Sequence, residues 1–436
     1  MKKILPVLAD LLIIYGSIIL VFYLFEYNHL LENFEENFQA FEIVYPFIGV
    51  FCLILLYAFG LYDIIHKDIP ELIYLVFLVS ISLMFGIMGF CFLVKDVALA
   101  FPRSVIIFST LLFFILLSVW HFFLWILYHK RHSPKKITIV EGKDSRLSEI
   151  VTNGYARFYQ IENRCTENDS ALSAKIKSVD EVFIHADISP EAREKILMLC
   201  FKYDKAVLYI PKYFDLKVIS SSLYKTGDIP TFRISDMSLS PEDHFVKRII
   251  DVFFGTVALI LSIPLFLIFS ILIKLDGGPV FYIQERLTLN GKPFKMFKFR
   301  TMKPNAEADS GPVLAINNDQ RITKVGNFMR ILRVDEIPQL LNILKGEMSI
   351  VGPRPERSFF VQQFEQEIPE YHYRFRVKAG LTGLAQIEGK YNTSVEDKLR
   401  YDLIYINSYS VIKDFLIMLR TVKVLFFKSS TEGIKV

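Results

Sequence analysis

The chain has 436 residues, of which 52% are hydrophobic, and its formal net charge is only +4. This composition is too apolar for an ordinary soluble protein, so we expect a membrane protein that carries soluble domains. The small net charge argues against nucleic acid as a partner, and the four cysteines include no Cys-x-x-Cys pair for zinc or redox chemistry.

Four apolar runs fill most of the first 130 residues, at 5–25, 43–62, 72–94 and 105–127. Each is long enough to cross a hydrocarbon layer of about 30 Å as a helix, and four buried core helices in succession are a poorer explanation. The first run is long and lacks a clear cleavage site, which argues against a signal peptide. We therefore predict a transmembrane domain of four helices over residues 1–130.

Basic residues near the ends of these runs predict their orientation. Lys2 and Lys3 precede the first run, Lys67 follows the second, and four lysines and arginines lie between positions 130 and 136. The loop 26–42 has none, so the positive-inside rule places both ends of the block in the cytoplasm. Asp10 is the only acid inside the runs. Because we expect no acid–base pair there, a small-molecule transporter is a weak alternative.

Residues 137–235 alternate β-branched apolar segments with helical patterns, which predicts a parallel α/β sheet. The strand segments read KITIVEG, EVFIHAD and KAVLYIP, and a helix that follows the second strand has Ser189 as its N-cap and Pro190 at its first position. The turn after the first strand has one glycine where a dinucleotide fingerprint needs three. We predict a degenerate Rossmann-like domain with a structural or regulatory role, in which the lone His185 is structural, as is His244 beyond it.

A fifth apolar run spans residues 249–273, and basic residues flank it on both sides. Both flanks favour the cytoplasm, and Pro264 in the middle can kink a helix because it removes a backbone donor. We predict a re-entrant membrane helix over residues 245–274. The alternative is an ordinary fifth span, which would place the C-terminal domain outside the cell.

A mixed α/β domain is predicted for residues 275–436, and it begins with a basic, aromatic segment that ends in KMFKFRTM. Lys295, Lys298 and Arg300 recur there at short spacing. Taken alone, they favour a solvated basic edge near anionic head groups over a phosphate-binding strand.

The segment ILRVDEIPQLLNILKGEMSIVGPRPE places Asp335 and Glu336 directly before a helix predicted over residues 338–344. For an isolated pair, capping this helix is the commoner role. Two observations favour chemistry instead: the domain is tied to a membrane, and forked guanidinium groups, which suit phosphate oxygens, surround the pair. These are Arg321, Arg330, Arg333 and Arg354. Together they suggest phosphate chemistry on a lipid carrier, with a metal ion that neutralises charge.

Residues 245–435 closely resemble the polyprenyl-phosphate hexose-1-phosphate transferases, which are monotopic phosphoglycosyl transferases that initiate bacterial surface polysaccharides. The resemblance rests on KRIIDVFFG, GPVFYIQERLTLNGKPFKMFKFRTM, RITKVGNFMR, DEIPQLLNILKGEMSIVGPRPE and KAGLTGLAQIEG, in that order. The N-terminal helices and the α/β domain resemble the long-form members of this family in architecture only.

The resemblance implies transfer of a hexose-1-phosphate, with glucose or galactose expected, from a UDP-sugar to undecaprenyl phosphate with release of UMP. Asp335 would be a nucleophile that forms a phosphoaspartyl-sugar, Glu336 a ligand of Mg²⁺, and Arg330 a phosphate-binding catalytic residue. An aspartate needs no base at neutral pH, so the lack of a histidine constellation is expected. The predicted substrate-binding residues are Lys298, Arg300, Arg321, Gly352, Pro353, Arg354, Pro355, Arg374 and Lys378.

The resemblance also implies a multi-pass protein of the bacterial inner membrane whose catalytic domain faces the cytoplasm. Its product would start an exopolysaccharide, capsule or O-antigen repeat unit. Membrane lipid, a second copy of the chain and downstream glycosyltransferases are the expected partners. The alternative is a non-catalytic membrane scaffold, in which the Asp335–Glu336 pair only caps a helix.

Overall fold

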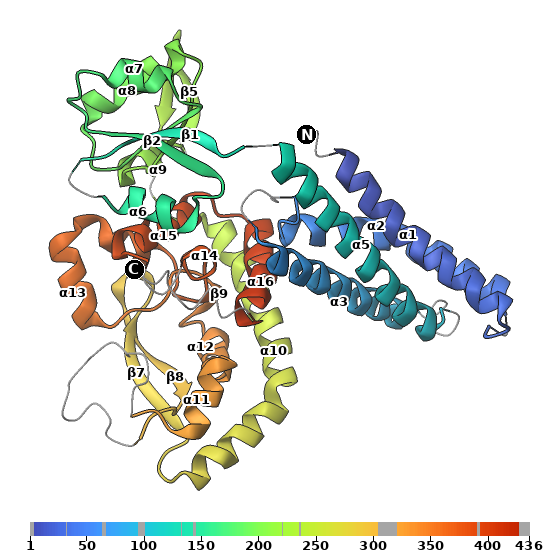
Figure 1. Cartoon of the computed structure of the whole chain (residues 1–436). Helices are drawn as coiled ribbons and strands as arrows, with labels where there is room; N and C mark the ends of the chain where they lie inside the picture. The colour runs from blue at the N-terminus through green and yellow to red at the C-terminus, as the bar shows by residue number, and fades with distance from the viewer. Residues whose placement is uncertain are drawn as a thin grey trace. The chain divides into compact units, whose positions relative to one another are not determined.

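A computed structural model describes residues 4–31, 33–62, 67–94, 101–131, 133–142, 145–219, 221–234, 237–303, 321–389 and 393–426. Lys2 and Lys3, which contribute to the predicted orientation, lie outside these ranges. The chain forms two compact units, Met1–Ile210 and Pro211–Val436 (Figure 1).

The four N-terminal apolar runs are helices, as predicted: α1 (Ile4–Tyr27), α2 (Phe34–Ala58), α3 (Ile69–Leu93) and α5 (Arg103–Arg131). Each is long and apolar enough to cross a membrane. Helix α3 packs against α2 and α5, and α1 also packs against α5. Helix α2 begins earlier than the apolar run predicts because its first turn is polar, with Glu35 and Glu36 near the positive end of the helix.

The expectation that the helix block contains no acid–base pair is wrong. Asp10 of α1 lies 3.2 Å from Nε2 of His121 on α5, and both side chains are fully buried. The hydroxyl of Tyr62 donates a hydrogen bond of 2.8 Å to the same carboxylate. Because a buried charge is costly unless it is paired, these contacts hold α1 and Tyr62, four residues after the end of α2, to α5.

The predicted parallel sheet is present, in the order β2-β1-β3-β4. The predicted segments correspond to β1 (Lys135–Val140), β3 (Glu181–Ile184) and β4 (Ala206–Tyr209), and the sequence missed β2 (Tyr159–Cys165). Strand β2 lies at an edge and alternates polar residues with half-buried ones, so it lacks the apolar run of a buried strand. Helices α6 (Arg146–Gly154), α7 (Leu172–Lys177) and α8 (Pro190–Lys202) separate the strands.

One local prediction in this domain, the start of the helix after the second predicted strand, is confirmed. Ser189 caps α8 by accepting from the backbone N–H of Ala192, and Pro190 is the first helical residue. The backbone N–H of Gly142, after β1, donates to both carboxylate oxygens of Asp187, at 3.2 and 3.1 Å. An aspartate of the same domain therefore occupies this backbone donor. His185 also contacts Asp187, with its Nδ1 at 2.8 Å.

The second unit begins at Pro211, inside the predicted 137–235 domain. Residues after this point form α9 (Tyr213–Ile219) and an antiparallel hairpin, β5 (Ser222–Thr226) with β6 (Ile229–Arg233), which the sequence analysis did not separate from the sheet. Helix α9 packs against α15 (Val395–Asn407), deep in the C-terminal part of the chain.

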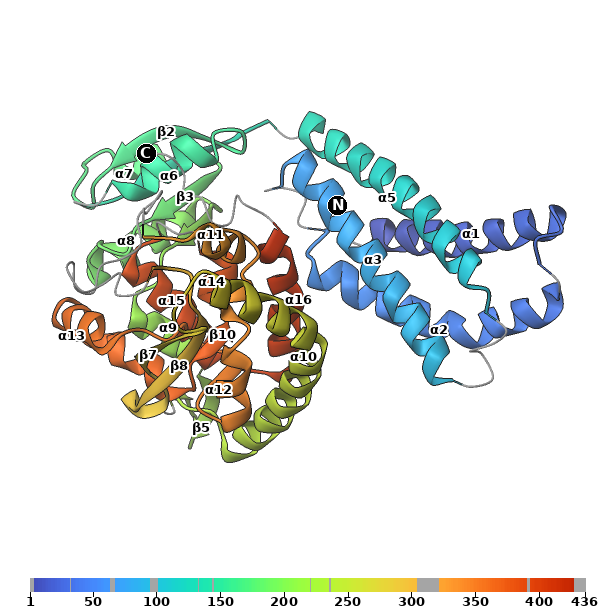
Figure 2. The ribbon, with the colours of Figure 1, turned by 90° about the horizontal axis from the view of Figure 1, so that it is seen from below.

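The fifth apolar run belongs to α10 (Pro241–Leu275), a single helix that continues through Pro264. Its ribbon changes direction along its length in both views (Figures 1 and 2). Gly255 allows close packing against Ile343 and Leu344 of α12 (Gln339–Lys345). Near its end, Phe269 and Ile273 share a buried cluster with Phe299, Met329 and Val334. Helix α10 is thereby packed against the segments that carry the predicted site.

The remaining elements of the second unit lie to one side of this helix (Figure 1). Strands β7 (Phe281–Leu287) and β8 (Pro293–Phe299) form an antiparallel hairpin around η2 (Leu289–Gly291), with Tyr282 directly opposite Lys298. Strands β9 (Ser349–Val351) and β10 (Gly380–Thr382) are parallel. The other elements are α11 (Lys324–Ile331), η3 (Val334–Glu336), α13 (Ser358–Glu367), η4 (Pro369–Arg376), α14 (Leu384–Glu388) and α16 (Val411–Phe426).

Candidate active site

The carboxylate pair projects from η3, a single 3₁₀ turn between α11 and α12. The turn starts at Arg333, whose backbone is left-handed at φ 54°, and Val334 anchors it in the core. Helix α12 begins at Gln339, one residue from the predicted start. Neither carboxylate makes a described hydrogen bond to the first turn of α12, so the described contacts give no support to the alternative in which the pair only caps this helix.

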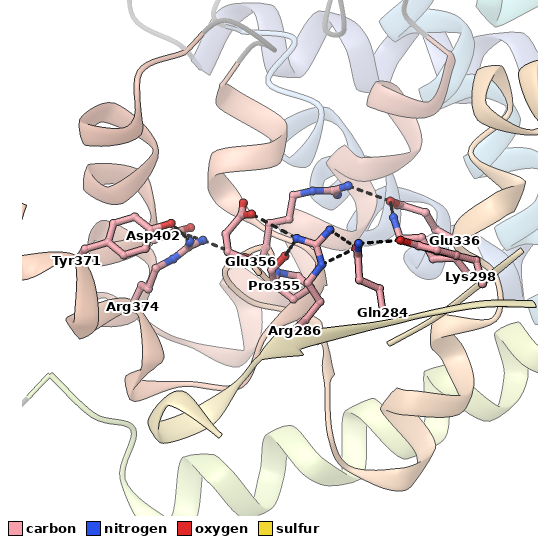
Figure 3. Close-up of polar contacts among 11 residues, drawn as sticks. Gln284, Arg286, Lys298, Glu336, Pro355, Glu356, Tyr371, Arg374 and Asp402 are labelled. Carbon is pink, nitrogen blue, oxygen red and sulfur yellow. Dashed lines mark hydrogen bonds and ion pairs between the residues drawn. The ribbon is translucent and has the colours of Figure 1, made fainter. Parts of the chain in front are cut away.

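Glu336 is held by two cations (Figure 3). Its Oε1 accepts a hydrogen bond of 2.9 Å from Nζ of Lys298 and one of 3.1 Å from Nη2 of Arg354. Burial alone would raise the pKa of Glu336, but Lys298 and Arg354 outweigh it and hold that pKa well below its usual value. Glu336 is therefore ionised at any physiological pH.

Asp335, in contrast, makes no hydrogen bond or ion pair with any described residue. Burial and the neighbouring charge of Glu336 raise its pKa to about 6, against the opposing effect of Lys298, Arg330 and Arg354. At neutral pH it is mostly a carboxylate, close to three cations but bonded to none of them. A carboxylate in this state could act as a nucleophile or bind a cation, because no bond to a described residue would have to break first.

The loop 352–356, which carries Arg354, is fixed through its backbone. The carbonyls of residues 353, 354, 355 and 356 accept hydrogen bonds from Gly380 N, Arg374 Nη2, Arg286 Nη1 and Leu287 N, at 2.8, 2.9, 3.3 and 3.0 Å. Gly352 lies so close to Lys378 and Gly380 that an added Cβ would meet their backbone at 2.4 and 3.0 Å. The rigid loop directs the half-exposed Arg354 side chain toward Glu336.

Arg374, a predicted substrate-binding residue, lies behind this loop in the structure. It is buried, forms an ion pair of 2.9 Å with Asp402, and donates to the Arg354 carbonyl and the Tyr371 hydroxyl (Figure 3). Its described contacts are those of a residue that supports the loop. Burial raises the pKa of its partner Asp402 to about 6.

Two residues on β7, Gln284 and Arg286, belong to the hydrogen-bond network around the loop 352–356 and were not predicted as site residues from the sequence. Arg286 donates to the Pro355 carbonyl and pairs with Glu356 at 3.4 Å, and Gln284 accepts from Arg286 and donates to the Tyr282 hydroxyl. The two-residue period of a strand could have identified them. Residues 282, 284 and 286 share the face on which Lys298 lies, because directly opposed residues of a hairpin point the same way.

The other predicted residues are more scattered. Nε of Arg330 donates to the Thr301 hydroxyl at 2.9 Å, and Arg330 is close enough to affect Asp335. Arg300 is buried and donates to the Ile273 carbonyl at the end of α10. The carbonyl of Arg321 accepts from the N–H of Lys303. Lys378 lines a different cavity, at the start of α10.

The predicted ligand, Glu336, carries a carboxylate, which is a type of group that binds Mg²⁺. Within the described residues, no group of three or more His, Cys, Asp or Glu could hold a metal ion. Mg²⁺ is commonly bound by one or two carboxylates together with substrate phosphates and water. Glu336, which is ionised, supplies one such carboxylate.

Residues 242–428 match the bacterial sugar transferase family. A relative from Aeromonas hydrophila, UDP-N-acetylgalactosamine-undecaprenyl-phosphate N-acetylgalactosaminephosphotransferase, is 38% identical over 53% of this chain and 54% of its own length. UDP-glucose:undecaprenyl-phosphate glucose-1-phosphate transferase from Escherichia coli (strain K12) is 37% identical over 57% of this chain and 55% of its own length. The match thus spans about half of these two relatives. The Exopolysaccharide production protein ExoY from Rhizobium meliloti (strain 1021) is 38% identical over 42% of this chain and 87% of its own length.

Proposed function

The chain belongs to the bacterial sugar transferase family, and on that premise we propose that it transfers a hexose-1-phosphate from a UDP-sugar to undecaprenyl phosphate. The products are UMP and an undecaprenyl-diphospho-sugar, the first intermediate of a surface polysaccharide. Glucose or galactose is the expected hexose. The observation that carries the proposal is an unpaired carboxylate, Asp335, beside Glu336, which Lys298 and Arg354 hold in its ionised form.

The reaction takes two steps at Asp335. Its carboxylate oxygen attacks the phosphorus next to the sugar, the bond to the bridging oxygen breaks, and UMP leaves. A phosphate oxygen of undecaprenyl phosphate then attacks the same phosphorus, the acyl-phosphate bond breaks, and the carboxylate is regenerated. This ping-pong scheme lets a soluble donor and a lipid acceptor use one carboxylate in turn.

Positioning and charge stabilisation account for most of the catalysis in such a reaction. Arg354 has further N–H donors beyond the one bonded to Glu336, and they suit donor phosphate oxygens. Lys298 and Arg330 add positive charge around the transferred phosphoryl group. Glu336 would hold Mg²⁺, which when bound neutralises charge on the donor's pyrophosphate.

We further propose that α10 is a re-entrant helix and that the catalytic domain faces the cytoplasm of the inner membrane. Basic residues on both flanks of α10 and Pro264 inside it support this arrangement. Single cysteines at positions 242 and 292, which are both exposed, should be labelled from the same side of the membrane. Labelling from opposite sides would establish an ordinary fifth span.

The activity is tested with membranes that contain the chain, undecaprenyl phosphate, Mg²⁺ and a panel of UDP-sugars. The panel includes UDP-glucose, UDP-galactose and UDP-N-acetylgalactosamine, the last because of the name of the Aeromonas relative. We expect UMP release with at least one donor. If no donor gives UMP, the non-catalytic scaffold becomes the better explanation.

A further inference from the structure

Helix α10 carries a buried carboxylate, Asp251, which the proposed reaction does not use. Its side chain is 3% exposed. Its Oδ1 accepts two hydrogen bonds of 2.9 Å, one from the Ser349 hydroxyl and one from the Ile350 backbone N–H. Because a buried carboxylate is costly unless hydrogen bonds satisfy it, these contacts fasten α10 to β9.

Strand β9 depends on this carboxylate because β10 covers only one of its edges. The Ser349 N–H donates to the Ala379 carbonyl at 2.9 Å, so it points toward β10. Since successive residues of a strand direct their N–H groups to opposite edges, the Ile350 N–H points the other way. Asp251 supplies the acceptor for this second edge.

A second contact from the same face of α10 reaches the last residue of β9. Lys247, four residues before Asp251, donates to the Tyr405 hydroxyl at 3.1 Å, and that hydroxyl lies 3.3 Å from the Val351 carbonyl. Lys247 also pairs with Asp414 at 2.5 Å, which balances its charge. One turn of α10 therefore holds every residue of β9, either directly or through Tyr405.

The loop 352–356 continues directly from β9, and Arg354 is three residues beyond Val351. The carbonyls of the loop are held from β7, η4 and β10, whereas β9 sets where the loop starts. The Arg354 guanidinium donates to Glu336 at 3.1 Å. An N–H···O bond tolerates only about 2.7–3.2 Å between the heavy atoms, so a small displacement of β9 is enough to break this contact.

We propose that Asp251 is a positioning residue for donor binding: by holding β9 against α10, it sets the place of Arg354. The inference rests on the proposed function, in which Arg354 binds phosphate oxygens of the donor. Asp251 acts through β9 and takes no part in the chemistry. The apolar helix α10 thereby gains a further role, because the way it packs against β9 determines whether the donor site is formed.

The test compares two substitutions at position 251 in the purified full chain, with the donor that gives UMP release. Asp251→Leu leaves the Ser349 hydroxyl and the Ile350 N–H without their acceptor, so the Michaelis constant for the donor should rise about tenfold. The turnover number at saturating donor should fall by less than about twofold, because the reacting groups are unchanged. Asp251→Asn keeps an oxygen that can accept both bonds, so its Michaelis constant should stay within about threefold of the unmodified value.

The matched control is Ser262→Ala. Ser262 is also buried on α10, but its hydroxyl donates only to the Leu259 carbonyl of the same helix, so neither kinetic constant should change. Hydrogen exchange distinguishes positioning from a general loss of stability. Peptides that cover residues 349–356 should exchange faster in Asp251→Leu, and peptides that cover β7 and β8 should exchange as in the unmodified chain.

UDP, measured by isothermal titration calorimetry, is a probe that needs no turnover. If no donor gives UMP, the proposed function fails, and the affinity for UDP still tests Asp251: the Leu variant should bind about tenfold more weakly than the Asn variant. Equal affinity in the two variants, or no binding of UDP to the unmodified chain, would overturn the inference. So would a fall in the turnover number of Asp251→Leu with an unchanged Michaelis constant, which is the result of partial misfolding.

Discussion

Two arginine–carboxylate pairs lie on either side of the loop 352–356, and they differ in what they leave free. Arg374 and Asp402 are both almost fully buried, and Arg374 also donates to Tyr371 and to the loop backbone. Arg354 and Glu336 are partly exposed, and next to them Asp335 has no partner. The same residue types therefore support the loop on one side and offer a reactive group on the other. Exposure and spare bonding capacity distinguish the two.

The largest expected effect follows removal of the unpaired carboxylate. Asp335→Asn keeps the shape of the side chain but removes the nucleophile, so turnover should fall by at least about 1,000-fold. Mass spectrometry should detect a phosphosugar on the unmodified chain incubated with donor but no acceptor, and none on the variant. Asp276→Asn, at the C-cap of α10, is a matched control that should keep full activity. Undiminished turnover in Asp335→Asn would refute the assignment.

Breaking the buried pair should primarily affect stability. Asp402→Asn leaves the Arg374 charge buried without a counterion, which costs about 3–5 kcal/mol in comparable cases. Both tryptophans lie in the N-terminal helix block, so their fluorescence would not report on this region. Hydrogen exchange measured on peptides that cover residues 352–356 should instead show faster exchange.

A double variant separates the two roles of Arg374. Arg374→Met with Asp402→Leu replaces the ion pair by apolar groups and should restore much of the lost stability. It cannot restore the hydrogen bond to the Arg354 carbonyl, which positions the side chain proposed to bind the donor. The Michaelis constant for the donor should therefore be higher in the double variant than in the unmodified chain. If the double variant regains both stability and donor affinity, Arg374 has no positioning role.

The sequence predicted the features that depend on local pattern. Four apolar helices, three strands of the sheet and the Ser189 cap follow from hydrophobic periodicity and from residue types at helix ends. Strand β2 was missed because a polar edge strand has no such pattern. The pair of Asp10 with His121 was missed because it joins residues 111 positions apart.

In the candidate site, too, residues within local motifs were predicted, whereas contacts between distant residues were not. Lys298, Glu336 and Arg354 were predicted from their motifs, and the structure brings them into contact. Arg374 was placed at the substrate because sequence alone cannot distinguish a buried arginine from an exposed one. Its partner Asp402, 28 positions further on, gave no signal, since an acid on an amphipathic helix normally faces solvent.

Neutralising Glu336 should have a smaller effect than removing Asp335. Glu336→Gln removes a predicted metal ligand and frees Lys298 and Arg354, and we expect turnover to fall by about 100-fold. The residual activity should need more Mg²⁺, which a titration of UMP release against the metal would show. Glu388→Gln, which affects an exposed pair with Arg420, should leave both quantities unchanged. An unaltered requirement for Mg²⁺ in Glu336→Gln would exclude it as a ligand.

The smallest expected effect is a change in the pH dependence of the first step. Burial and the charge of Glu336 raise the pKa of Asp335 to about 6, and only the deprotonated form can attack phosphorus. The rate of UMP release should therefore be half-maximal near pH 6 and fall roughly tenfold for each pH unit below that. Glu336 keeps its charge over this range, because its own pKa is lowered.

Two variants should move this acid limb in opposite directions. Glu336→Gln removes a negative neighbour, so the pKa of Asp335 should fall and the limb should shift to lower pH. Lys298→Met removes a positive neighbour, so the limb should shift to higher pH. The residual activity of each variant, measured as UMP release across pH 4.5–8, gives both shifts. A limb that neither variant moves belongs to a group other than Asp335. In that case the contrast between the unpaired Asp335 and the paired Asp402 would not explain where the reaction occurs.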